Sequence, residues 1–259
     1  MDDGRRELYV RALALPGALI AARAVTAVMP GAVRMLSMWV HETGHAAAAW
    51  FTGFPAFPGP WFTPVDLERS LAMTVVVIGA LAAGIYSAWR SERWFWVACA
   101  AALLPLALFG SFGLHPLYAQ QLIIFGGDGG CFVLGSVLML TLYARADHPM
   151  RTERLRWACL ALGALAFMDA RATWFGDVAA IPFGEDERGF SDPSVLTELY
   201  AWTVPVLVGR YQQLAAACFA VLAGGWAIGL WAAYSETRNA ATASTPSSFP
   251  RTRRTAATR

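Results

Sequence analysis

The chain has 259 residues, of which 57% are hydrophobic and only 15% charged, and this composition excludes an ordinary soluble domain. The net charge is +2, and the basic residues, all arginine, form no stripe suited to a duplex, so nucleic acid is excluded as a partner. Long apolar blocks separated by short charged segments predict an all-α, polytopic transmembrane helix bundle that contacts the lipid bilayer.

Six apolar blocks are long enough, or nearly so, to cross a hydrocarbon core of roughly 30 Å. In chain order they are residues 32–51, 71–89, 94–114, 119–144, 157–175 and 212–234. The N-terminal stretch 8–29 is also apolar, but it contains Arg11, Pro16 and Arg23. This stretch suits an interfacial helix as well as a seventh span.

Three regions follow from this pattern. Residues 1–30 form an N-terminal interfacial or transmembrane segment, and residues 31–234 form the membrane-embedded bundle. Within the bundle, the block 199–209 is too short to cross and contains Pro205, which predicts a re-entrant or interfacial piece. Residues 235–259 are rich in Ala, Thr, Ser, Pro and Arg, so we expect a disordered tail.

One short motif carries most of the chemical information. His41 and His45 stand four residues apart, so on a helix they project from one face and can bind one metal ion. Glu42 beside them can act as general base on a metal-bound water, which predicts a Zn²⁺ hydrolase site. The alternative is two helix histidines that merely bond to neighbouring spans, but ionisable groups within a span are costly and usually functional.

The motif H-E-T-G-H at residues 41–45, followed by alanines within a predicted span, resembles the site-2-protease family of intramembrane zinc metalloproteases. The resemblance implies a third zinc ligand from an Asp-Gly pair on a later span, matched here by Asp128 and Gly129. It implies Glu42 as the catalytic residue, and it implies these metal ligands: His41, His45 and Asp128. A membrane protein or peptide is the implied substrate.

A depth estimate agrees with this ligand set. At 1.5 Å rise per residue, His45 lies about 12 Å and Asp128 about 13 Å from the outer ends of their predicted spans. The alternative for Asp128 is a buried carboxylate bonded to glycine amides or to a helix end.

The chain departs from the family pattern, because no Asn-x-x-Pro element precedes Asp128. The later segments resemble a bacterial subgroup in which an aspartate late in a span is followed by Ser-Asp-x-x-x-Leu, as in Asp169 and residues 191–196. Asp169 is therefore a rival third ligand, and its alternative role is pairing with Arg171 or a helix end. We interpret Ser191-Asp192-Pro193 as an N-cap with proline in the first helical turn.

The segment 53–64 contains four prolines among aromatic residues and cannot be a helix. By resemblance, such a loop handles the unwound substrate and presents an edge to an extended peptide. The alternative is an aromatic belt that anchors the bundle at the membrane interface.

Peptide hydrolysis rests on the resemblance, because the same site chemistry would suit another amide or an ester. Two other functions stay open. One is a non-proteolytic membrane protein with a structural or sensory metal site, and the other is an ion or solute transporter whose buried His, Glu and Asp line a path. A diiron desaturase is excluded, because two usable histidines are too few.

Arginines in the connecting segments predict the topology, since short cytoplasmic loops carry the basic excess. The arginine-rich segments are residues 90–93, 145–156 and 235–259. We therefore expect a cytoplasmic C-terminus and an acidic segment 176–198 on the opposite side, and the resemblance implies that the membrane is the bacterial cytoplasmic membrane. Alkaline phosphatase joined after residue 198 should be active, and the same reporter joined after residue 234 should be inactive; the reverse pattern would invert the topology.

Overall fold

The computed structural model describes residues 3–144, 153–186 and 189–243, and it confirms the all-α prediction. The α-helices are α1 Asp3–Val28, α2 Pro30–Phe51, α3 Leu71–Arg90, α4 Trp94–Leu108, α5 Pro116–Leu140, α6 Glu153–Trp174, α7 Asp192–Ser194 and α8 Val204–Ala243. The shorter turns are η1 Phe109–Gly113, η2 Thr141–Tyr143, η4 Val178–Ala180 and η5 Val195–Leu199. The strands β1 Glu185–Asp186 and β2 Gly189–Phe190 form one small antiparallel pair.

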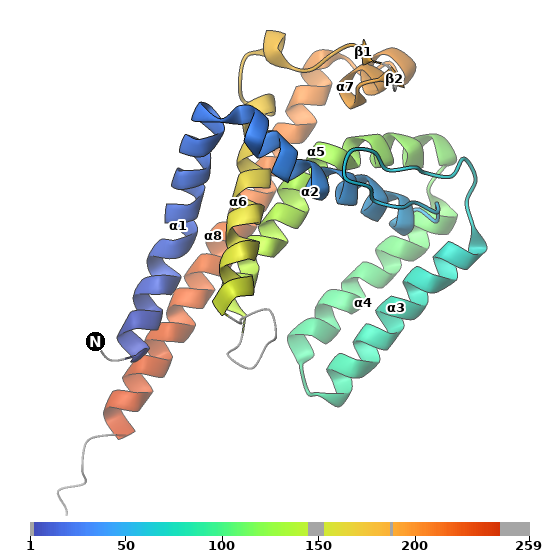
Figure 1. Ribbon diagram of the computed structural model, residues 1–259. Helices are drawn as coiled ribbons and strands as arrows, with labels where there is room; N and C mark the ends of the chain where they lie inside the picture. The colour runs from blue at the N-terminus through green and yellow to red at the C-terminus, as the bar shows by residue number, and fades with distance from the viewer. Residues whose placement is uncertain (1–2, 145–152, 187–188, 244–259) are drawn as a thin grey trace, which may run out of the picture.

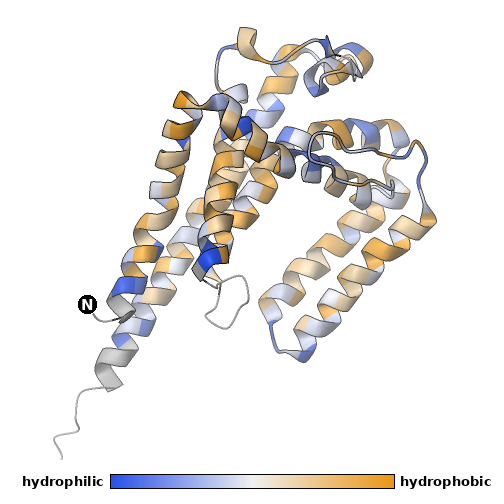
Figure 2. Ribbon diagram, in the orientation of Figure 1, coloured by the Kyte–Doolittle hydropathy of each residue, from blue (hydrophilic) through white to orange (hydrophobic). Residues whose placement is uncertain are grey.

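Five helical segments in the described part of the chain are long and apolar enough to cross a membrane. They are Arg6–Val28, Leu71–Arg90, Trp94–Gly113, Pro116–Tyr143 and Val204–Arg238. Four of them coincide with predicted spans, and the first is the N-terminal stretch whose status the sequence left open. Figure 2 shows apolar colours along α3 and α4 and a hydrophilic turn between them. The chain is thus a helical membrane protein.

The predicted span 32–51 forms α2, but α2 is too polar to belong to this set. Figure 1 shows it running across the upper part of the molecule, at a steep angle to α1, α6 and α8. Pro30 explains the sharp turn, because proline has no N–H to continue α1 yet suits the first turn of α2. The depth estimate for His45 assumed that α2 crosses the membrane, and α2 is not among the helices that are long and apolar enough to do so.

The helices form two groups. Helices α1, α5, α6 and α8 pack together around one apolar core, whereas α3 and α4 pair with each other and reach the rest mainly through α2. Helix α6 covers the predicted span 157–175 and is also too polar for the apolar set, but it packs against α1, α2 and α5. Figure 1 places the α3–α4 turn and the C-terminal end of α8 at one end, as the arginine grouping predicts.

Helix α8 is longer than the sequence predicted at both ends. It begins at Val204, so most of the block 199–209 that we expected to be re-entrant is already helical. Pro205 is tolerated there because the first helical turn has no need of its N–H. At the other end, residues 235–243 are helical and not disordered, and residues 244–259 of the expected tail lie outside the described residues.

Glycines bring α2 and α5 into backbone contact. Figure 1 shows α5 bent near its middle, where its sequence holds four glycines around Asp128. A Cβ on Gly44 would lie 2.1 Å from the carbonyl oxygen of Gly126, and one on Gly130 would lie 2.4 Å from the Cα of Gly44. Only glycine fits such an approach, and the approach places the H-E-T-G-H motif against the bend of α5.

This contact gives a prediction about stability. Gly44→Ala should lower the free energy of unfolding by roughly 1–3 kcal/mol, because the new methyl group overlaps backbone that cannot move cheaply. Gly79→Ala on α3 is the matched control, because nothing lies within 4 Å of its Cβ position and alanine favours a helix. Thermal unfolding in detergent, followed by circular dichroism, checks both; equal melting temperatures for the two variants would contradict the close packing.

Candidate metal centre

The two motif histidines point their rings at a common point. Their Nε2 atoms lie 3.1 Å apart, and both side chains are buried. Behind the rings, His45 Nδ1 lies 2.7 Å from the carbonyl oxygen of Ile123, and His41 Nδ1 lies 2.9 Å from Asp128 Oδ1. A carbonyl and a carboxylate can only accept hydrogen bonds, so each neutral ring carries its proton on Nδ1 and turns its Nε2 lone pair forward.

Asp192 supplies a third atom at this point. Its Oδ2 lies 3.1 Å from His41 Nε2 and 3.1 Å from His45 Nε2, so the three atoms form a triangle with equal sides. Burial disfavours the charged carboxylate, but His45 and His41, when protonated, hold the pKa of Asp192 well below its usual range. When the rings are neutral, the lone pairs of the two Nε2 atoms and of Asp192 Oδ2 point at one another. A bound cation stabilises that arrangement.

The triangle fits a zinc ion. Zinc with bonds of 2.0–2.1 Å to nitrogen and tetrahedral angles holds its ligand atoms about 3.3 Å apart, close to the observed spacing. Gly127 of α5 borders the same space, because a Cβ there would lie 2.6 Å from both Nε2 atoms. Any side chain at position 127 would therefore fill the space in front of the two rings, which we call the metal cradle.

The segment that carries Asp192 is built as the sequence predicted. Ser191 Oγ accepts a hydrogen bond from Ser194 N at 3.4 Å, and Pro193 occupies the first turn of α7, so the N-cap interpretation is confirmed. Sequence reasoning treated this cap as structural only. The cap also turns the intervening Asp192 towards the histidines, and no periodicity marks a single residue in a loop for such a role.

Two hydrogen bonds tie this segment to the first turns of α5. Tyr200 donates through its hydroxyl to Gln120 Oε1 at 3.1 Å, and Trp202 donates through Nε1 to Gln121 Oε1 at 3.1 Å. These contacts fix the loop between α6 and α8 on the same helix that supplies the wall of the metal cradle.

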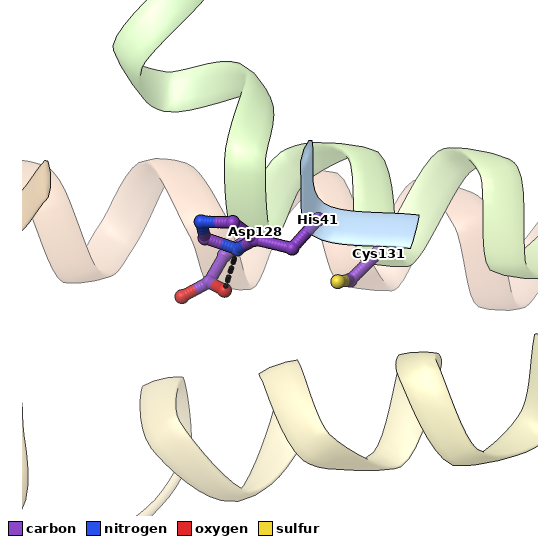
Figure 3. A group of neighbouring side chains, drawn as sticks. All are labelled: His41, Asp128 and Cys131. Carbon is purple, nitrogen blue, oxygen red and sulfur yellow. Dashed lines mark hydrogen bonds and ion pairs between the residues drawn. The ribbon is translucent and has the colours of Figure 1, made fainter. Parts of the chain in front are cut away.

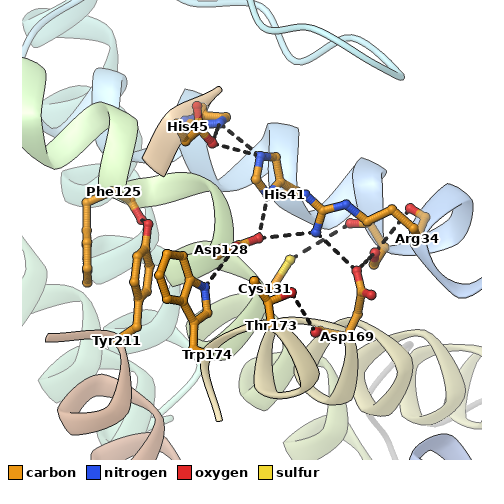
Figure 4. Close-up of polar contacts among 12 residues, drawn as sticks. Arg34, His41, His45, Phe125, Asp128, Cys131, Asp169, Thr173, Trp174 and Tyr211 are labelled. Atoms are coloured by element: carbon orange, nitrogen blue, oxygen red, sulfur yellow. Dashed lines mark hydrogen bonds and ion pairs between the residues drawn. The ribbon is translucent and has the colours of Figure 1, made fainter. Parts of the chain in front are cut away.

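Asp128, expected as the third ligand, lies behind His41 instead. Besides the bond to His41 Nδ1, its Oδ1 lies 3.3 Å from Arg34 Nη1, and its Oδ2 accepts from Trp174 Nε1 at 2.8 Å. Figure 4 shows Asp128 and His45 on different sides of the His41 ring. The structure therefore does not gather His41, His45 and Asp128 around one point, because Asp128 faces the wrong ring nitrogen. Its role matches the carboxylate that orients a metal-binding histidine.

Asp169, the rival ligand, is further away. Its Oδ2 lies 3.2 Å from Arg34 Nη1 and contacts the hydroxyl of Ser37. The expected partner Arg171 instead places its guanidinium over the ring of Phe175, 5.2 Å from the centroid. Both candidate aspartates are thus bound to the same arginine.

Besides the role of Asp192, sequence reasoning also missed Arg34. It is the only basic residue in the block 32–51, and it stands two helical turns before His41 on the same face of α2. A buried carboxylate needs a cationic partner. An arginine two helical turns before His41 therefore indicates a partner for aspartates that lie near the motif, here Asp128 and Asp169.

A second group of possible metal ligands, Cys131 with His41 and Asp128, is drawn in Figure 3. A metal there would bind His41 through Nδ1 and would break its bond to Asp128. It would also not bind His45, and it would not supply a water for Glu42 to deprotonate. The group that contains Asp192 uses both motif histidines, so we favour it as the metal centre.

The metal centre opens into a cleft of about 550 Å³. As predicted, the segment after α2 is not helical; it folds back on itself through a bridge between Ala56 and Val65 and forms one wall. Residues 182–185 and 189–193 and Val195 also line the cleft. The cleft is lined by the motif residues His41, Glu42 and His45, by Asp192, and by the aromatic side chains of Trp61, Phe62, Phe183 and Phe190.

Comparisons of the chain with protein-family models, with curated proteins and with solved structures found no match. The function is therefore inferred from the residues of the site and their geometry.

The ligand set gives a prediction about metal content. Asp192→Ala should lose zinc, because it removes one of three ligands. Asp128→Asn should still bind zinc but with an affinity lower by roughly 10- to 100-fold, because it weakens the support of His41. Asp177→Asn is the control, because the Asp177 carboxylate accepts from the Ala179 N–H in an exposed turn and does not line the cleft. Mass spectrometry of metal content and competitive zinc titration of the purified chain measure both effects; zinc loss in Asp128→Asn with retention in Asp192→Ala would restore the ligand set expected from the sequence.

Proposed function

We propose that the chain is an intramembrane zinc metallopeptidase of site-2-protease type that hydrolyses peptide bonds in or near the bilayer of the bacterial cytoplasmic membrane. The observation that carries the proposal is the triangle of His41 Nε2, His45 Nε2 and Asp192 Oδ2 beside Glu42 in an open cleft. Three protein ligands with one open position are typical of catalytic zinc, whereas structural zinc has four. This favours an enzyme over a structural or sensory site.

Each residue has a defined role in the proposed reaction. When bound, zinc supplies an activated water at neutral pH and polarises the substrate carbonyl. His41 and His45 hold the ion through Nε2, and Asp128 and the Ile123 carbonyl keep the rings oriented through Nδ1. Glu42 takes the proton from water on its carboxylate and passes it to the leaving amine nitrogen.

The walls of the cleft support a peptide substrate. Aromatic side chains from both connecting segments border the metal centre, and apolar walls favour the large side chains of a membrane peptide. Transport is the weaker alternative. The described polar groups of the site form hydrogen bonds or ion pairs with one another, and those that are accessible border one cleft.

Replacement of the general base tests the proposal. Glu42→Gln should lower cleavage by roughly 10²- to 10⁴-fold while zinc content stays at one ion per chain, because Glu42 is a base and not a ligand. Suitable probes are fluorescein-labelled casein and a quenched-fluorescent transmembrane peptide in the same detergent. Chelation should abolish cleavage and added zinc should restore it. Unchanged cleavage in Glu42→Gln would eliminate the mechanism.

A further inference from the structure

The general base is held by a residue from outside its own helix. Thr63 Oγ1 lies 2.7 Å from Glu42 Oε2 and 2.9 Å from the Glu42 backbone carbonyl oxygen. Both side chains are buried. The two residues are 21 positions apart, so the contact exists only because the segment 53–70 folds back over α2.

We propose that Thr63 is the positioning residue for Glu42, and this inference rests on the proposed function. It makes the proline-rich segment a working part of the site, in addition to any anchoring at the membrane interface. The segment is stiff enough for this task, because Phe57 N donates to the Pro64 carbonyl at 3.2 Å and Gly59 N donates to the Phe62 carbonyl at 3.2 Å. Thr63 therefore reaches Glu42 from a hairpin and not from a loose loop.

The position of the hydroxyl suits both protonation states of Glu42. A hydroxyl donates one hydrogen bond and can accept others. While Glu42 is a carboxylate, Thr63 Oγ1 donates its proton to Oε2. When Oε2 has taken a proton from water, Oε2 donates to Thr63 Oγ1, and the hydroxyl proton of Thr63 turns to the Glu42 carbonyl oxygen. The proton later leaves Oε2 for the amine nitrogen of the product, and Thr63 returns to its first orientation.

The same hairpin links the base to the substrate. Trp61 and Phe62 line the cleft immediately before Thr63 in the chain. A peptide that contacts these aromatic rings therefore contacts the same segment that orients Glu42. The position of the bound substrate and the orientation of Glu42 are thus coupled through residues 61–63.

Isosteric replacement tests the role of the hydroxyl. Thr63→Val should lower kcat by roughly 10- to 100-fold, with KM within about twofold of the wild-type value and zinc content unchanged. Thr63→Ser should retain most of the activity, because it keeps the hydroxyl. Thr74→Val is the matched control, since the Thr74 hydroxyl is also buried and donates to a backbone carbonyl, that of Ser70, at the start of α3. Thr63→Val should have no further effect in the Glu42→Gln background.

A second measurement does not depend on activity. The carboxylate band of Glu42, identified from the infrared difference between wild type and Glu42→Gln, should shift in Thr63→Val and stay in place in Thr63→Ser. Unchanged kcat, loss of zinc from Thr63→Val, or an unshifted band would each overturn the inference. If the wild-type chain cleaves no probe, the proposed function fails, and the infrared band alone decides whether Thr63 orients Glu42.

Discussion

The ion pairs of Arg34 with Asp128 and Asp169 are the interaction on which the rest of the site depends. One guanidinium from α2 lies 3.3 Å from a carboxylate of α5 and 3.2 Å from a carboxylate of α6, and both carboxylates are buried, whereas the arginine side chain is 37% exposed. A buried carboxylate without a partner is strongly destabilising, so these pairs hold three helices in one relative position. Because Asp128 also accepts from His41, the same pairs help to fix the direction of the His41 ring.

This network can form only because α2 and α5 touch through their backbones. Side chains as long as arginine span the gap between ordinary helices, but the 2.9 Å bond from His41 to Asp128 requires a closer approach. Glycine at position 44 and in the bend of α5 provides it. The glycines and the charges are thus interdependent, since the glycines allow the approach and the ion pairs hold it.

Apolar blocks predicted the helices well and their orientation less well. Block 71–89 became α3 almost residue for residue, because the helix is apolar along its whole length and little of it is buried by other elements, so hydropathy alone defines it. Block 32–51 is apolar enough to look like a span, yet Arg34 pairs with Asp128 and Asp169 and Glu42 bonds to Thr63, and α2 lies across the molecule. The Asp-Gly pattern placed Asp128 beside the motif but cannot specify which ring nitrogen it faces. Asp192 was not predicted as a ligand, because its position depends on contacts between distant segments, such as that of Tyr200 with Gln120, which no local sequence pattern records.

The transverse position of α2 bears on how hydrolysis can occur in a membrane protein. A site at the centre of a span must draw water through hydrocarbon, whereas α2 lies at the end of the bundle where the two long connecting segments meet. Those segments provide Asp192, the proposed third ligand, and Thr63, which bonds to the proposed base. The proposed reaction therefore takes its histidines from a helix and completes its site from connecting segments, so water and peptide can enter the cleft from that end of the bundle.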